Sequence, residues 1–167
     1  MADFEIKVSP AEPCKIDYSK SIEELTAYYD DLAKKIAGGQ PELASGEFMQ
    51  LGYALDFLAM VKKIFNIDLS FDEAAIPTLD QIIAALSQAI LTKKIPPEAG
   101  SDIMKKATGF LSVVIWKNIG GSFISSNIGY GVNINGTNAF VYNRIGRRLQ
   151  GDSSCDVTSF YNELKKL

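Results

Sequence analysis

The chain has 167 residues, of which 47% are hydrophobic and 22% are charged, values typical of one folded domain and not of a disordered chain. It contains no histidine and only two cysteines, which excludes His-based catalytic triads, histidine proton relays and zinc sites built from His and Cys. The net charge of −3 gives no long-range attraction to nucleic acid or to an anionic membrane. We therefore expect no nucleic-acid partner, no membrane partner and no cofactor.

Residues 1–20 contain Pro10 and Pro13 and show little periodicity, which predicts an extended arm that either caps the domain or stays mobile. Residues 21–167 are expected to form a single α+β domain. The acidic N-terminus lacks the basic region and apolar stretch of a signal peptide, and uninterrupted apolar stretches are far shorter than the ~20 residues of a membrane span. These features predict a cytoplasmic protein with free thiols.

Two helices are predicted after the arm. Ser21 and Glu24 have the spacing of a capping box, which predicts a helix from there to about Ala37. A second helix is expected from near Ser45 to about Phe65, because apolar residues recur along it in a wide stripe. We interpret this stripe as core packing and not as a lipid or cofactor groove.

Two further helices follow. The run Thr78-Leu79-Asp80-Gln81 predicts a second capping box, which opens a helix with Ile82, Ile83, Leu86 and Ile90 directed inward. Ser101 or Asp102 is expected to cap a fourth helix, which should end at Gly120-Gly121. Residues 111–116 are apolar and rich in β-branched side chains, so a strand is an alternative for the second half of this helix.

Beyond Gly120 the composition changes to asparagine, glycine and β-branched residues. Asn135-Gly136 predicts a type I′ hairpin turn that joins strand 130–134 to strand 137–142, and residues 122–125 could add a third strand. A last helix is expected to start near Asp156. The face of the hairpin directed at the helices should hold Tyr130, Val132, Ile134, Thr137, Ala139 and Val141; the last helix should bury Val157, Phe160, Tyr161 and Leu164. The predicted fold is α+β: about four N-terminal helices, a small antiparallel sheet and a C-terminal helix.

The candidate binding residues follow the predicted hairpin. All three arginines of the chain, Arg144, Arg147 and Arg148, lie within five residues, directly after Asn143. The planar guanidinium fork suits a carboxylate or a phosphate, so this cluster could receive an acidic partner surface or an anionic ligand. The alternative is a structural role, in which nearby Asp152 and Asp156 neutralise the cluster within the chain.

Two single residues are further candidates. Trp116 is the only tryptophan, and it is either a core anchor or an interface residue, so we add it to the candidate binding residues. Cys155 precedes the predicted last helix, whose dipole could lower the pKa of the thiol. A nucleophilic thiol usually needs a histidine, and the chain has none. We therefore predict no catalytic residue.

Several short motifs in the C-terminal part occur in the order Gly109-Phe110-Leu111, Gly120-Gly121, Asn138-Ala139-Phe140, Arg147-Arg148-Leu149 and Phe160-Tyr161. Over roughly residues 65–164 this order resembles an uncharacterised bacterial domain family with a glycine-aromatic helix, an Asn-Pro-Phe-like strand and a terminal Phe-Tyr helix. The chain departs from that pattern at Ser112-Val113-Val114-Ile115, where Gly-Glu-Val-Ile is usual and a carboxylate is therefore missing, and at Ala139, where a proline is usual. The resemblance implies an α+β fold, and the family has no established enzymatic activity to carry over to this chain; some relatives look like immunity-type or antitoxin-type proteins.

These observations predict a non-enzymatic cytosolic bacterial protein that acts as a protein-interaction or immunity-type module, with a partner that has an acidic surface. The alternative is an enzyme or binding protein for a small phosphorylated or carboxylated ligand, held by the arginines with Asn143 and Cys155.

Overall fold

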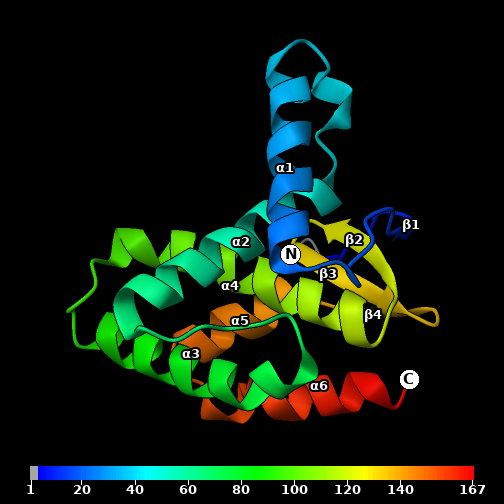
Figure 1. Cartoon of the computed structure of the whole chain (residues 1–167). Helices are drawn as coiled ribbons and strands as arrows, with labels where there is room; N and C mark the ends of the chain where they lie inside the picture. The colour runs from blue at the N-terminus through cyan, green and yellow to red at the C-terminus, as the bar shows by residue number, and fades with distance from the viewer. Residues whose placement is uncertain (1–3) are drawn as a thin grey trace.

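The computed structural model describes residues 4–167 and has the predicted α+β architecture, with a small antiparallel sheet at one side of the packed helices (Figure 1). The helices are α1 (Ile22–Ala37), α2 (Gly46–Phe65), α3 (Ile76–Leu91), α4 (Pro97–Asn118), α5 (Val141–Leu149) and α6 (Val157–Lys165). The strands are β1 (Glu12–Pro13), β2 (Ser122–Ser126), β3 (Gly129–Ile134) and β4 (Thr137–Ala139), in the order β1-β2-β3-β4.

The first two helices begin and end as predicted. The Ser21 hydroxyl accepts a hydrogen bond from the Glu24 amide at 3.1 Å, and the Glu24 carboxylate accepts one from the Ser21 amide, which completes the capping box. Ser45 caps α2 through a single hydrogen bond, which its hydroxyl accepts from the amide of Phe48. Helix α1 projects away from the other helices (Figure 1), and Leu25 is its one buried residue.

The predicted capping box at Thr78–Gln81 is wrong. Helix α3 starts at Ile76 with Pro77 in its first turn, where the fixed φ of proline favours the helix and its missing amide proton costs nothing. Asp80 is therefore inside α3. Its carboxylate instead accepts hydrogen bonds from the amides of Val157 at 2.8 Å and Thr158 at 2.9 Å, so it binds the first two amides of α6.

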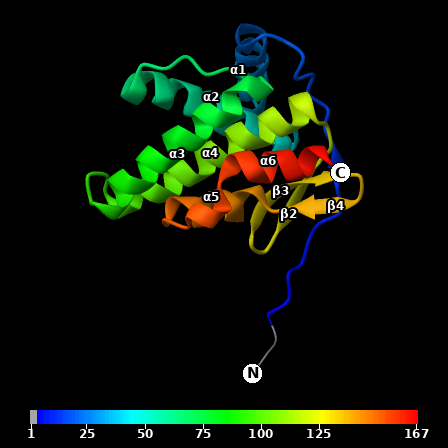
Figure 2. The same cartoon turned by 90° about the horizontal axis from the view of Figure 1, so that it is seen from below.

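Helix α4 is the centre of the core. It begins at Pro97, earlier than the predicted cap at Ser101 or Asp102, because proline again occupies the first turn. Residues 107–116 are all buried, with α2 packed along one side and α5 along another (Figure 2). The strand alternative for residues 111–116 is wrong. Neighbouring elements bury every face of the helix there, so its apolar residues do not show the spacing of an amphipathic helix.

The hairpin turn is confirmed: Asn135 and Gly136 have φ values of 50° and 86°, as a type I′ turn requires, and Ile134 pairs with Thr137. Strand β2 is the third strand expected at residues 122–125. The strand predicted over 137–142 is too long, because β4 ends at Ala139 and Val141 already belongs to α5. On the predicted inward face Val132, Ile134 and Ala139 are buried, whereas Thr137 is exposed.

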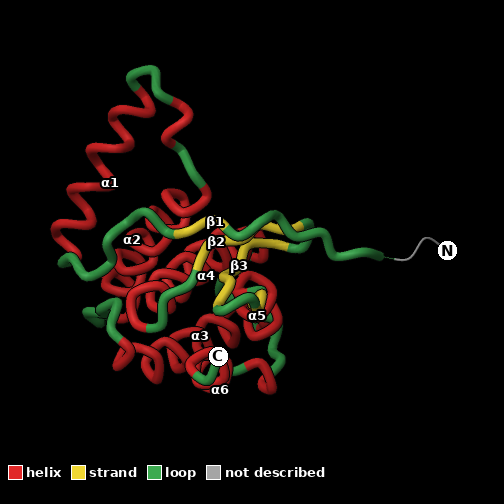
Figure 3. The backbone as a smooth tube through the Cα atoms, turned by 90° about the vertical axis from the view of Figure 1, so that its right-hand side faces the viewer, coloured by secondary structure: helices red, strands yellow, loops and turns green. Residues whose placement is uncertain are grey.

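Part of the N-terminal arm caps the sheet (Figure 3). Strand β1 pairs with β2, and Val8 bridges to Ser126 beyond it. The buried Glu47 carboxylate of α2 then accepts hydrogen bonds from the amide of Lys15 at 2.8 Å and from the Tyr18 hydroxyl at 2.7 Å. These contacts attach the arm to the sheet edge and to the start of α2.

One helical segment among the described residues, Glu73–Leu91, is long and apolar enough by length and composition to cross a membrane. Core helices meet the same criterion. Here Leu79, Ile83 and Leu86 are buried inside the protein, and α3 packs against α5 and α6.

Candidate functional site

The predicted arginine cluster lies on a helix that the sequence analysis did not identify. In α5 the buried residues Val141, Ile145 and Leu149 recur every four positions and fix one side of the helix to the core. The opposite side therefore carries Arg147 outward, together with Asn143, which is partly buried. The spacing of the three buried residues was the signal in the sequence that could have predicted the helix.

Two of the arginines lie on one flank of α5, four residues apart. The Arg144 guanidinium stacks over the Phe160 ring of α6, 4.9 Å from its centroid, which is a cation–π contact. The Nε atom of Arg148 is buried and has no hydrogen-bond partner within residues 4–167, and neither has the buried Oδ1 atom of Asn143. The side chains of Arg144 and Arg148 thus pack partly against the protein itself.

Arg147 is the arginine that solvent reaches most freely, with its side chain 66% exposed. Its guanidinium pairs with Asp152 at 3.2 Å, which is the internal neutralisation that the sequence offered as the alternative. The pKa of Asp152 is lowered to about 2, first by hydrogen bonds from the Ser154 side chain and Cys155 and least by the charge of Arg147.

Asp156 has a different role. It caps α6 by accepting a hydrogen bond from the Ser159 amide at 2.9 Å. Hydrogen bonds from Ser159 are also the main cause of its lowered pKa, to which the charge of Arg144 adds a smaller effect. Asp156 therefore stabilises the helix start more than it neutralises the arginines.

Trp116 lies in the core of the protein and away from the exposed side of α5. Its ring is 6% exposed, stacks on Tyr18 with centroids 5.6 Å apart and meets the edge of Phe123 at 6.4 Å. Its indole nitrogen donates to the Ser122 carbonyl. The core-anchor interpretation fits this position, and the structure does not bring Trp116 together with the arginines.

Cys155 is 2% exposed, in a short 3-10 turn before α6, and its sulfur lies 3.4 Å from an Asp152 oxygen. Burial beside a carboxylate does not favour attack by a thiolate on an external substrate. No group of three or more His, Cys, Asp or Glu side chains within residues 4–167 is placed to hold a metal ion.

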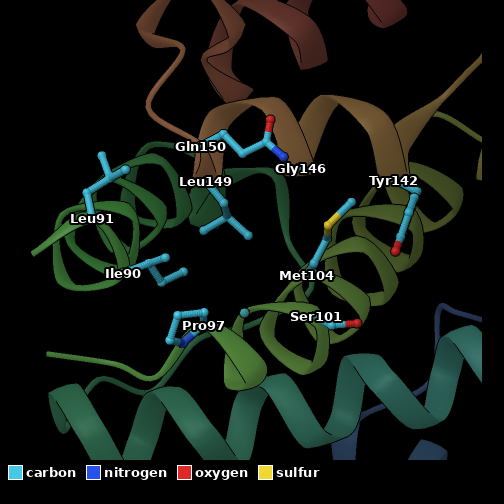
Figure 4. A pocket seen from close by; sticks show the side chains of 10 residues that line it. Ile90, Leu91, Pro97, Ser101, Met104, Tyr142, Gly146, Leu149 and Gln150 are labelled. Carbon is cyan, nitrogen blue, oxygen red and sulfur yellow. The ribbon is translucent and has the colours of Figure 1, made fainter. Parts of the chain in front are cut away.

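A groove that the sequence analysis missed lies on the other flank of α5 (Figure 4). It has a volume of about 440 Å³ and is formed where α4 and α5 meet the end of α3. The wall is mostly apolar, and none of the three arginines contributes to it. Among the lining residues are Ile90, Leu91, Met104, Tyr142, Leu149 and Gln150.

Comparisons with protein-family models, with curated proteins and with solved structures find no match for the chain. The resemblance to an uncharacterised bacterial family stays a prediction, and the candidate site rests on its own geometry.

Proposed function

We propose that this protein is a non-enzymatic, cytoplasmic interaction module of bacterial immunity type, and that it binds an acidic surface of a partner protein through the exposed side of α5. The observation that carries the proposal is the position of Arg147, whose side chain points outward from the short helix α5 and is 66% exposed. The composition supports it, since no histidine is present for the usual proton-transfer chemistry.

The pairing of Arg147 with Asp152 is compatible with this role. An exposed ion pair contributes little to stability, so an incoming carboxylate can replace Asp152 without unfolding the protein. Arg144 and Arg148 lie along the neighbouring flank and keep the local charge positive in a protein whose net charge is −3. Arginine binds carboxylates in a planar, bidentate geometry, which gives such a surface specificity as well as attraction.

The alternative, a small phosphorylated or carboxylated ligand held by the arginines with Asn143 and Cys155, has less support at this place. Cys155 is buried, and the arginines do not line the groove beside α5. A small anion at α5 would remain largely in water, where an ion pair with Arg147 is weak.

The test compares affinity capture by three forms of the protein from lysate of the source cells: wild type, Arg147→Glu and Lys34→Glu. The two variants change the net charge equally, but exposed Lys34 lies on the projecting α1. We expect a specific partner to be captured by wild type and Lys34→Glu and lost with Arg147→Glu. Purified partner should then show at least a tenfold weaker affinity for Arg147→Glu, because charge reversal replaces attraction by repulsion at the contact.

A fourth form, Asp152→Asn, sharpens the test. It removes the competing carboxylate and should strengthen binding of the same partner, provided that the thermal midpoint shows a folded protein. Equal loss of binding in Arg147→Glu and Lys34→Glu would mean that only net charge matters, and a partner that all forms retain equally would place the contact away from α5.

A further inference from the structure

A second hollow adjoins the groove beside α5, and Tyr142 lines both. The second hollow, of about 540 Å³, lies between α4 and the turn that joins β2 to β3. Ser101 and Met104 line the first hollow, while Lys105 lines the second. Residues 101, 104 and 105 lie on one face of α4. Residues 101 and 105 are one helical turn apart, so the residues of α4 that line the two hollows are separated by only about 6 Å.

The first hollow, which is the groove beside α5, is apolar and large enough for a small molecule; we call its interior the chamber. Its walls include two glycines inside helices, where glycine costs about 1 kcal/mol relative to alanine. Gly146 accommodates the Met104 side chain, since a Cβ atom there would lie 2.4 Å from Met104 Cε. A Cβ atom on Gly100 would meet only Ile90 Cδ1 at 3.9 Å, so no packing constraint explains this glycine. The missing side chain of Gly100 leaves space in the chamber.

The second hollow carries a positive charge that no ion pair within residues 4–167 neutralises. Lys105 is exposed and takes part in none of the ion pairs within residues 4–167. The adjacent Lys106, by contrast, pairs with Asp102 at 2.8 Å. Tyr130 and Tyr142 line the same hollow and carry hydroxyl groups that can donate hydrogen bonds.

We propose that the two hollows form one binding site for a small amphiphilic anion, with its apolar body in the chamber and its acidic head group beside Lys105. An apolar groove that adjoins Lys105 and the hydroxyl groups of two tyrosines matches the two parts of such a ligand. This site is separate from the side of α5 that is proposed to bind an acidic partner surface, so either proposal can fail without the other.

The experiment titrates the isotope-labelled full chain with a series of carboxylates, from acetate through hexanoate and octanoate to decanoate, and follows backbone amide shifts by NMR. We expect saturable shifts at Ser101, Lys105 and Gly146. Each added methylene should tighten binding by about three- to fourfold until the chamber is full. Octanoate should bind more tightly than octanol, and octylamine more weakly than both.

Two variants and one control test the two ends separately. Gly100→Leu fills the chamber and should weaken octanoate binding at least tenfold while the protein stays folded. Lys105→Gln should weaken octanoate binding by about two- to fivefold and remove the preference over octanol, as expected for an exposed ion pair. Lys106→Gln, with the same charge change, should have no effect.

Three results would overturn the assignment. One is an affinity that does not depend on chain length, and another is equal binding by wild type and Gly100→Leu. The third is saturable binding of a short peptide with apolar and acidic residues together with no binding of octanoate, which would assign the groove to a protein partner.

Discussion

Replacing tyrosine by phenylalanine should have opposite effects on stability at two buried positions. The Tyr18 hydroxyl donates a hydrogen bond of 2.7 Å to the buried Glu47 carboxylate. The Tyr161 hydroxyl is also buried, but it has no hydrogen-bond partner within residues 4–167. The same loss of one oxygen atom therefore removes a charged hydrogen bond at one position and an unpaired polar group at the other.

The magnitudes follow from these two environments. A hydrogen bond to a charged group contributes about 1.5–3 kcal/mol, so Tyr18→Phe should lower the free energy of unfolding by about 2 kcal/mol. A buried hydroxyl without a partner opposes folding, so Tyr161→Phe should raise the free energy of unfolding by about 1 kcal/mol. Urea denaturation at neutral pH measures both changes, with an unchanged m-value as the check on two-state unfolding.

The pH dependence adds a second readout for Tyr161. Burial raises the pKa of Tyr161 from 10.0 to about 12, and the nearby Glu73 carboxylate adds to the shift. Above pH 10 the unfolded chain releases this proton more readily than the folded protein, so stability should fall as the pH rises through this range. Tyr161→Phe should make the alkaline decline shallower. Equal destabilisation by both Tyr→Phe variants would refute the assignment of paired and unpaired hydroxyls.

Three further predictions concern the packing of the fold. Asp80→Ala should cost about 1–2 kcal/mol in urea denaturation and increase hydrogen exchange at the start of α6, because it removes the carboxylate that binds the first two amides of that helix; unchanged exchange there would contradict this role. Gly109→Ala should cost about 2–3 kcal/mol, because the added Cβ atom would lie 2.6 Å from the Gln50 carbonyl oxygen and force α2 and α4 apart; a neutral effect would refute this close contact. Cys155 should resist alkylation by iodoacetamide in the folded protein and react in urea, as mass spectrometry can show, and Cys14 should also react slowly because burial and the nearby Glu47 raise its pKa; rapid labelling of folded Cys155 would contradict its burial.

Local signals predicted the parts of the fold that depend on near neighbours in the chain. The capping box at Ser21 and the Asn135-Gly136 turn both involve residues within three positions, and both are present. The run at Thr78 has the same pattern as Ser21 and still fails. There Pro77 fixes an earlier start, and the Asp80 carboxylate finds amides of α6, which is distant in the sequence.

The candidate site was predictable only in its residues and not in its geometry. The clustering of the arginines is a property of the sequence, but their separate environments depend on contacts with other segments. Arg144 meets Phe160 of α6, and Arg147 meets Asp152 beyond the end of α5. The groove beside α5 left only a weak signal, a glycine inside α4, because its walls come from three helices that pack together only in the fold.

The measurement that tests the proposed role of α5 most directly is labelling of arginine side chains with a dicarbonyl reagent, read by mass spectrometry, on the free protein and on the complex with its captured partner. In the free protein Arg147 should react faster than Arg144 and Arg148, because its side chain is 66% exposed. In the complex we expect labelling of Arg147 to fall at least tenfold, with labelling of Lys34 by an amine reagent unchanged. Continued rapid labelling of Arg147 in a saturated complex would contradict the proposal that the partner binds this side of α5.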